Sequence, residues 1–180
     1  MDLKLTDKVA LVTGASIGLG VAIAKQLALE GCRLAILARR GALLETVADE
    51  VAATGAARPL IIVQDITADG MAERVRSSVT DHFGRLDILV NNAGGSRPMA
   101  GLGTEEEWEE AMLLNFVAAR RLTHALVPDM RANGFGRIIN LTGADEPSGM
   151  NAAVPPNGAV HLWAKALSRE VGGDGVTVNS

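Results

Sequence analysis

Apolar residues along this chain follow two alternating patterns. The first is a short, nearly continuous run of valine, isoleucine and leucine, which is typical of a strand covered on both faces. Runs of this kind predict strands over 8–14, 32–38, 59–65, 86–92, 136–143 and 176–180. The second is a longer segment with apolar residues at helical spacing, which predicts helices over 17–30, 41–54, 68–83, 104–132 and 155–171.

Two of the predicted helices begin with clear local signals. Thr104 opens the segment TEEEWEE, in which a capping threonine precedes acids that favour the positive end of the helix dipole. Pro155 and Pro156 open the last predicted helix, where the N–H groups that proline lacks have no helical partner anyway. Both starts support the helix boundaries that the apolar spacing predicts.

The alternation of strands and helices predicts the fold class. It is typical of a parallel sheet with helices on both faces. Right-handed crossovers then give an α/β, doubly wound, Rossmann-type sheet of about six strands. A chain of 180 residues without internal repeats or a linker suits one domain, so we expect a single unit over 1–180.

Composition and charge narrow the class of protein. Apolar residues make up 48% of the chain and charged residues 21%, a balance that favours a folded core over disorder. The net charge of −4 argues against binding to nucleic acid or to an anionic membrane surface. No apolar run is long enough to span a bilayer. We therefore expect neither a nucleic-acid nor a membrane partner.

Cysteine and histidine residues indicate neither a disulfide nor a metal site. Cys32 is the single cysteine and begins an apolar run, so a buried thiol in a reducing compartment is favoured over a redox nucleophile. The N-terminal segment has no apolar stretch of the kind found in signal peptides. His82 and His124 lack metal-ligand spacing. We expect a cytoplasmic protein without a metal.

A glycine-rich segment, TGASIGLG over 13–20, lies between the first predicted strand and the first predicted helix. Gly14 can form the tight turn, Gly18 leaves room for a pyrophosphate, and Gly20 allows helix and strand to pack closely. Free N–H groups at the helix start attract phosphate. A glycine-rich turn without a ligand is the other interpretation, but the position between strand and helix favours a dinucleotide.

The glycine spacing G-x-x-x-G-x-G, together with NNAG over 91–94, resembles the short-chain dehydrogenase/reductase family. Further segments are similar to family motifs: QDIT over 64–67, LLNFVAARRLTHALVPDM over 113–130, GRIINLTG over 136–143 and GVTVNS over 175–180. The likeness covers essentially the whole chain. It implies an oxidoreductase that uses a nicotinamide dinucleotide. In the family, an aspartate after the third strand and the next backbone N–H meet the adenine.

The glycine segment and the resemblance together predict which residues bind the cofactor. They are Thr13, Gly14, Ser16, Ile17, Gly18, Gly20, Arg39, Arg40, Asp65, Ile66, Asn92, Ala93 and Gly94.

Charge at the end of the second strand indicates which nicotinamide cofactor is bound. NAD-binding Rossmann domains place an acid there for the ribose hydroxyls. Here Ala38 takes that position and is followed by Arg39 and Arg40. Two arginines suit a 2′-phosphate, and without an anion they would be unfavourable at the positive end of a helix. We therefore predict NADP(H) over NAD(H), with two solvated arginines as the alternative.

The family resemblance implies a catalytic set of asparagine, serine, tyrosine and lysine, yet this chain contains no tyrosine. Asn115 matches the asparagine. His161 and Lys165 could be taken as replacements for tyrosine and lysine, because they too are four residues apart. Counting back from the VNS motif instead places the tyrosine position at Ala153 and the lysine position at Asn157. His161 is then two turns further along the helix, as a packed or interface residue.

The serine position falls on Gly143, beside Thr142, and Ser148 is a second hydroxyl candidate in the same loop. The catalytic candidates are therefore Asn115, Thr142 and Asn157. Asn157 could hydrogen-bond a ribose hydroxyl, but it carries no charge that would tune an acid. Water, Thr142 or a group of the substrate would have to transfer the proton.

Two interpretations of function remain from the sequence. The first is an NADP(H)-dependent oxidoreductase that acts on a small carbonyl or alcohol substrate through a non-standard proton step. The second is a catalytically inactive nucleotide-binding or scaffold member of the family. The resemblance of helices 104–132 and 155–171 to the family's dimer-forming pair also implies a homodimer or homotetramer. Because family members continue past the VNS strand, 1–180 is expected to lack their substrate loop and last strand.

Overall fold

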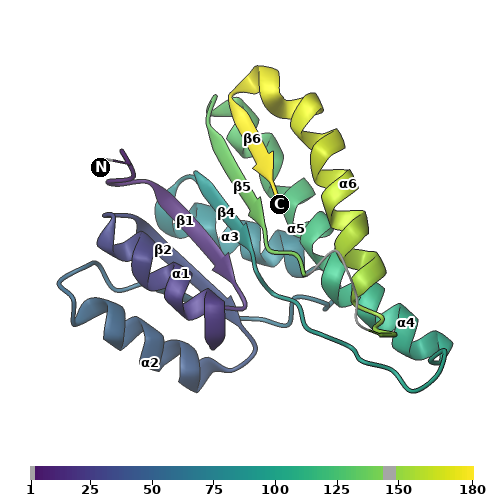
Figure 1. The fold of residues 1–180 in the computed structure, drawn as a ribbon. Helices are drawn as coiled ribbons and strands as arrows, with labels where there is room; N and C mark the ends of the chain where they lie inside the picture. The colour runs from purple at the N-terminus through teal and green to yellow at the C-terminus, as the bar shows by residue number, and fades with distance from the viewer. Residues whose placement is uncertain (1–2, 144–148) are drawn as a thin grey trace.

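The computed structural model describes residues 3–143 and 149–180 (Figure 1). Its strands are β1 (Val9–Thr13), β2 (Arg33–Ala38), β3 (Leu60–Val63), β4 (Ile88–Asn91), β5 (Gly136–Asn140) and β6 (Val176–Asn179). Its α-helices are α1 (Gly18–Leu29), α2 (Gly41–Ala52), α3 (Met71–Phe83), α4 (Glu105–Met112), α5 (Ala118–Ala132) and α6 (Val154–Val171). A π-helical turn, η1 (Leu113–Val117), joins α4 to α5, and a short 3-10 turn, η2 (Gly172–Asp174), follows α6.

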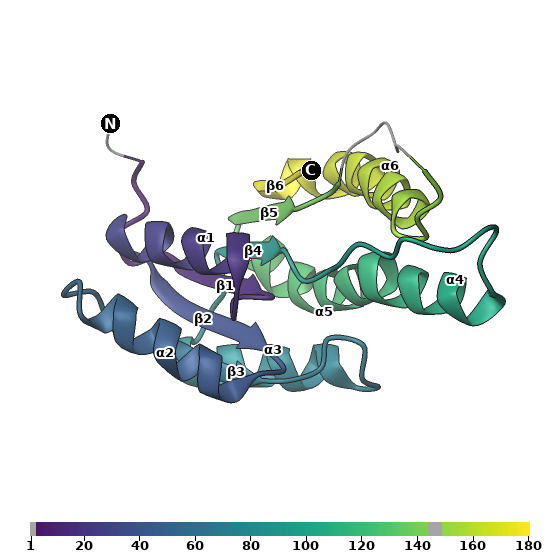
Figure 2. The ribbon, with the colours of Figure 1, turned by 60° about the horizontal axis from the view of Figure 1, so that its bottom comes forward.

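The described residues form one parallel sheet of six strands in the order β3-β2-β1-β4-β5-β6. Figure 2 shows α1 and α2 on one face of this sheet and α3, α5 and α6 on the other. The chain runs outward from β1 to β3 and then returns to β4 on the opposite side of β1. The prediction of a doubly wound α/β fold is confirmed. The reversal between β1 and β4 is the place where such sheets bind ligands.

The strands are continuously apolar because both faces of the sheet are covered. In β1, Ala10 and Val12 face the core beneath α1 and α2, whereas Leu11 faces the core beneath α3 and α5. All five residues of β1 are buried. Burial of apolar area on both faces contributes about 25 cal/mol per Å², so the central strands form the rigid base of the molecule.

The predicted helix over 104–132 is interrupted, because a π-helical turn separates α4 from α5. Asn115 lies in this turn, and its side-chain Nδ2 donates to the carbonyl of Ala111 at 3.0 Å. In a regular α-helix that carbonyl would accept the backbone N–H of residue 115. The apolar spacing continues through the turn, so the sequence pattern does not reveal it. Such turns are frequent at functional sites.

Candidate active site

A cleft of about 540 Å³ opens at the carboxyl ends of the central strands, beside the reversal between β1 and β4. Its walls come from the loop after each of β1, β2, β3 and β4, and from the α4–η1 junction. The cleft is lined by Gly14, Ser16, Ile17, Gly18, Leu19, Leu37, Ala38, Arg39, Arg40, Gln64, Asp65, Ile66, Thr67, Asn92, Ala93, Gly94, Arg97, Glu110, Leu113 and Leu114. Most of the predicted cofactor-binding residues therefore lie together in one cleft.

Thr13 and Asn92 join the glycine segment to the loop after β4. The Thr13 hydroxyl donates to the Val90 carbonyl at 3.2 Å and accepts from the backbone N–H groups of Asn92 and Ala93, both at 3.0 Å. In the opposite direction, Asn92 Nδ2 donates to the Thr13 carbonyl at 2.9 Å and to the Gly14 carbonyl at 3.3 Å. Thr13 itself is buried beneath the cleft, so the structure places it as a support of the loop.

The glycines of this segment meet different requirements. Gly14 has a φ of +67°, and a Cβ there would lie 2.9 Å from the Cα of Ala93. Gly20 is buried, and a Cβ would meet the Gly14 carbonyl and lie 2.6 Å from Asn92 Nδ2. Gly18 differs, because a Cβ would have no atom of the described residues within 4 Å. Its open side is the space that a pyrophosphate needs, so the segment fits a dinucleotide.

Two arginines and a serine converge where β2 ends. Arg40 Nη2 donates to the hydroxyl of Ser16 at 3.1 Å. Arg39 is largely exposed, and its Nη1 lies 3.9 Å from Asp65 Oδ2. The Thr67 backbone N–H and hydroxyl both donate to Asp65 Oδ1, at 2.8 and 2.7 Å. These hydrogen bonds, with a smaller contribution from Arg39, lower the pKa of the Asp65 carboxyl, so it stays ionised at neutral pH.

Asn115 lies at the other side of the cleft, one residue beyond the lining residue Leu114. Its Oδ1 accepts from the backbone N–H of Gly95 at 2.8 Å. A Cβ on Gly94 would lie 2.8 Å from the same oxygen, so a larger residue there would displace the Asn115 side chain. Asn115 thereby holds the loop after β4 against η1.

The structure brings Gly143 and Asn157 together, as the alignment by spacing predicts. A Cβ on Gly143 would lie 2.8 Å from Asn157 Nδ2. Thr142 is exposed just beyond the end of β5, and Ala153 is buried at the start of α6. Ser148 lies outside the described residues.

His161 lies on the exposed side of α6, where its Nδ1 is 2.9 Å from the Ser180 hydroxyl. It makes this contact beyond the end of β6, away from the lining of the cleft.

Three residues that the sequence does not single out take part in the site. Arg97 and Glu110 line the cleft and form an ion pair, with Arg97 Nη2 at 2.9 Å from Glu110 Oε1. Asn151 binds the backbone of Arg97 from a segment 54 positions away. Arg97 follows NNAG closely, which is a signal that could have found it. The partners of Glu110 and Asn151 are set by the fold, and no local pattern marks them.

Two further properties concern the described part of the chain. None of its helices is long and apolar enough to cross a membrane. It also contains no group of three or more histidine, cysteine, aspartate or glutamate side chains that could hold a metal ion.

The fold and the glycine-lined cleft together define a dinucleotide-binding α/β protein. The family model described as short chain dehydrogenase matches residues 8–180, and the chain belongs to this family of oxidoreductases. The family resemblance seen in the motifs is therefore confirmed. Members of the family bind nicotinamide cofactors.

Named relatives agree with this assignment. The 3-oxoacyl-(acyl-carrier-protein) reductase FabG of Vibrio cholerae is 36% identical over 182 residues, covering 99% of this chain and 73% of the relative. The structure of L-sorbose reductase from Gluconobacter frateurii with NADPH and L-sorbose has a TM-score of 0.95 at 33% identity, covering 99% of this chain and 70% of that one. A structure of NAD⁺-bound xylitol dehydrogenase has a TM-score of 0.91 at 27% identity, covering 98% of this chain and 69% of that one.

Proposed function

We propose that this protein is an NADP(H)-dependent oxidoreductase that acts on a small carbonyl or alcohol substrate. The convergence of Ser16, Arg39 and Arg40 at the end of β2 carries the choice of cofactor. Guanidinium groups bind phosphate through paired N–H donors, and Ala38 takes the place of the acid that NAD-binding domains use there. Asp65 offsets one of the two positive charges, so this end of the cleft keeps a net positive charge.

The cleft residues have complementary roles toward the cofactor. Backbone N–H groups from Gly14 to Gly18, at the start of α1, would hold the pyrophosphate. Asp65 and Ile66 would border the adenine, and Asn92, Ala93 and Gly94 would border the other half of the dinucleotide. When bound, the nicotinamide supplies or accepts a hydride. The protein contributes orientation, exclusion of water and a route for the proton.

The proton step must differ from one that uses a tyrosine. Ala153 can transfer no proton, and Asn157 can donate and accept hydrogen bonds but has no charge that would tune an acid. In this proposal, Asn157 would bind a ribose hydroxyl. Thr142, a water held near Asn115, or a group of the substrate itself would pass the proton. Such a step favours substrates that carry their own hydroxyl close to the reacting carbon.

A second candidate function is that of a catalytically inactive nucleotide-binding protein. The buried Ala153 beside the uncharged Asn157 favours it, because the site then orients a cofactor without moving a proton. A panel of small aldehydes, ketones and sugars distinguishes the two candidates. NADPH oxidation with any of them supports the oxidoreductase. Tight NADPH binding without turnover across the whole panel supports the second function.

The first experiment is a titration with NADPH and NADH, followed by quenching of Trp108 and Trp163 and by nicotinamide emission. We expect NADPH to bind more tightly than NADH. Arg39→Ala should weaken NADPH binding about tenfold or more, since a hydrogen bond to a charged group contributes about 1.5–3 kcal/mol, and should leave NADH nearly unchanged.

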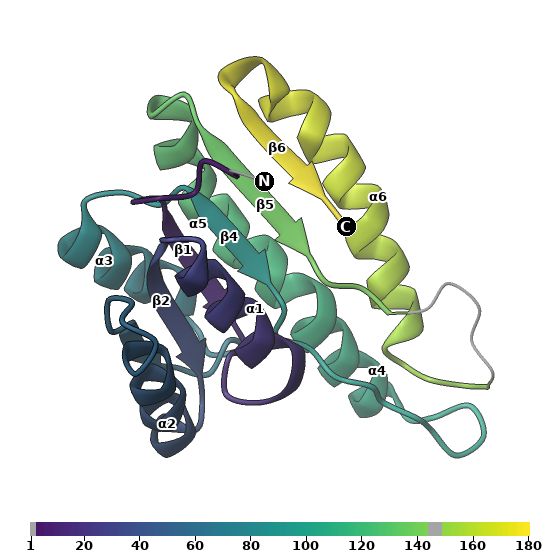
Figure 3. The same cartoon turned by 60° about the vertical axis from the view of Figure 1, so that its left-hand side comes forward.

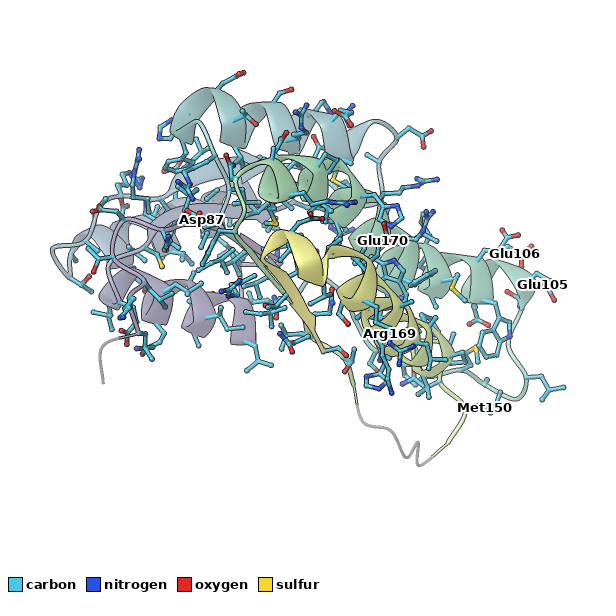
Figure 4. All side chains as sticks on the ribbon, turned by 90° about the horizontal axis from the view of Figure 1, so that it is seen from above. Asp87, Glu105, Glu106, Met150, Arg169 and Glu170 are labelled. Atoms are coloured by element: carbon cyan, nitrogen blue, oxygen red, sulfur yellow. The ribbon has the colours of Figure 1, made fainter. Side chains whose placement is uncertain are left out.

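Arg169→Ala is the matched control, because Arg169 is an exposed arginine on α6, outside the lining of the cleft (Figure 4). Equal losses of NADPH and NADH binding in Arg39→Ala would contradict the proposal that Arg39 binds the 2′-phosphate. Absence of binding by both nucleotides would overturn the proposed function altogether.

A further inference from the structure

Two segments that are distant in the sequence lie side by side at the mouth of the cleft. One follows NNAG, after β4, and the other leads into α6. Pro98 and Asn151 form an isolated antiparallel bridge between them. The Met99 N–H donates to the Met150 carbonyl at 3.2 Å, and the Ala152 N–H donates to the Arg97 carbonyl at 2.9 Å. Figure 4 shows Met150 at the same end of the molecule as Glu105 and Glu106 of α4.

The side chain of Asn151 adds three hydrogen bonds to this contact. Its Oδ1 accepts from the backbone N–H of Arg97 at 2.9 Å and from that of Ala153 at 3.0 Å. Its Nδ2 donates to the Ser96 hydroxyl at 2.7 Å. One half-buried amide therefore uses donor and acceptor groups to join both segments.

The start of α6 depends on this contact. Its N-cap residue, Ala153, has no side-chain cap hydrogen bond within the described part of the chain, and Pro155 and Pro156 have no N–H groups. The hydrogen bond from the Ala153 N–H to Asn151 instead determines where the first turn lies. That turn carries Asn157, which packs against Gly143.

The same contact fixes Arg97 on the cleft wall. Asn151 binds its N–H and Ala152 binds its carbonyl, so the Arg97 backbone is held on both sides. The Arg97 guanidinium then reaches α4, where Nε and Nη2 bond to Glu110 Oε1 at 3.2 and 2.9 Å. Arg97 and Glu110 both line the cleft.

We propose that Asn151 is a positioning residue for the nicotinamide end of the cleft. The adenosine end faces β2 and β3, where Arg39 and Asp65 lie, so the other half of a dinucleotide extends over β4 and β5. Asn151 ties together the two segments that border that half, and it acts through Arg97 and the first turn of α6. This role rests on the proposed function as a cofactor-binding protein.

Binding of whole and half cofactors separates this role from a general effect on the fold. The probes are NADPH and adenosine 2′,5′-bisphosphate, which reaches only the adenosine end. We expect Asn151→Ala to weaken NADPH binding about fivefold to tenfold, the equivalent of one or two lost hydrogen bonds, while adenosine 2′,5′-bisphosphate binding changes less than about twofold. Asn133→Ala, an exposed asparagine at the opposite end of α5, should change neither.

Asn151→Asp is the conservative variant. Its carboxylate can accept from the same two N–H groups and from the Ser96 hydroxyl, so NADPH binding should return to within about twofold of the wild type. Backbone amide exchange at Arg97 and Ala153 gives a readout without cofactor. It should accelerate in Asn151→Ala and stay slow in Asn151→Asp.

The outcomes are distinct. Faster exchange in Asn151→Ala with unchanged NADPH binding would overturn the positioning role while leaving the proposed function intact. Equal weakening of both probes, or failure of Asn151→Asp to rescue, would also overturn it. If the wild type binds adenosine 2′,5′-bisphosphate but not NADPH, both the positioning role and the proposed function are wrong.

Discussion

By motif spacing, Ala153 and Asn157 are predicted to take the positions at which the family resemblance implies a tyrosine and a lysine. Ala153 is the N-cap residue of α6, and Asn157 lies in its first turn, close to Gly143. Their spacing from Asn179 is a property of the sequence, and their assignment to the tyrosine and lysine positions stays a prediction. Neither side chain titrates near neutral pH, so the chemistry of this site must take its proton from another group.

Cys32 provides a prediction at the residue scale. Burial, with smaller contributions from Asp87 and Glu30, raises the pKa of its thiol from an ordinary value of 9.0 to about 11. The thiolate is the reactive form, so at pH 8 the folded protein holds about a hundredfold less of it than an ordinary thiol would. We expect slow alkylation by iodoacetamide at pH 8, with a rate that rises as the pH approaches 11.

The unfolded protein is the internal control, because Cys32 is the single cysteine. Alkylation in denaturant at pH 8 should be faster by about the same hundredfold or more, since access also improves. Equal rates in the folded and unfolded protein would show that the thiol is exposed and its pKa ordinary.

Between elements, close packing of α1 against the loop after β4 decides the shape of the cleft. Gly20 in α1 faces Gly14 and Asn92 with no room for a methyl group, whereas Gly158 in α6 is exposed and has no atom of the described residues near its Cβ position. The two residues are both helical glycines, so they form a matched pair. Only one of them is required by its surroundings.

Substitution of these two glycines should therefore have opposite effects. Gly20→Ala should lower the free energy of unfolding by about 1–3 kcal/mol through overpacking, and should weaken NADPH binding as the loop shifts. Gly158→Ala should raise the free energy of unfolding by about 0.5–1 kcal/mol, the gain in helix propensity. Denaturant unfolding measures the stability of both variants, and a nucleotide titration measures their NADPH binding. A Gly20→Ala protein as stable as the wild type would contradict the close contact.

Over the whole molecule, α5 and α6 cover the same face of the sheet, and α6 lies at its β6 edge (Figure 3), with His124 of α5 against Trp163 of α6. Leu162 of α6 is 69% exposed, so its side chain is accessible to a partner. We predict that these two helices form the contact between copies of the chain in a homodimer or homotetramer. Sedimentation should then show at least twice the 18.7 kDa mass of one chain.

Leu162→Glu should shift the equilibrium between monomer and oligomer toward the monomer, because a charge at an apolar interface carries a desolvation cost. Leu29→Glu is the control, since Leu29 is 64% exposed at the end of α1, on the other face of the sheet. A monomer at high concentration for the wild type, or equal effects of the two variants, would rule out this interface.

The sequence by itself determined the order of elements and the doubly wound class, and it pointed to the loops that surround the cleft. These follow from local properties, because strand and helix periods are read over a few residues and Gly14 and Gly18 mark backbone turns with positive φ. The absence of tyrosine is equally a fact of the sequence. The predicted roles of Asn115, Thr142 and Asn157 remain predictions.

Only the tertiary structure decided how distant segments meet. Thr13 joins the glycine segment to the loop after β4, because its hydroxyl pairs with backbone groups about 80 positions away. Its part in cofactor binding stays a prediction. Asn151 gains its role from Arg97, 54 positions away. Asn115, in the π-helical turn, likewise accepts from the N–H of Gly95, 20 positions away. A hydrogen bond depends on distances of about 3 Å, and no local pattern specifies which distant donor the folded chain will bring that close.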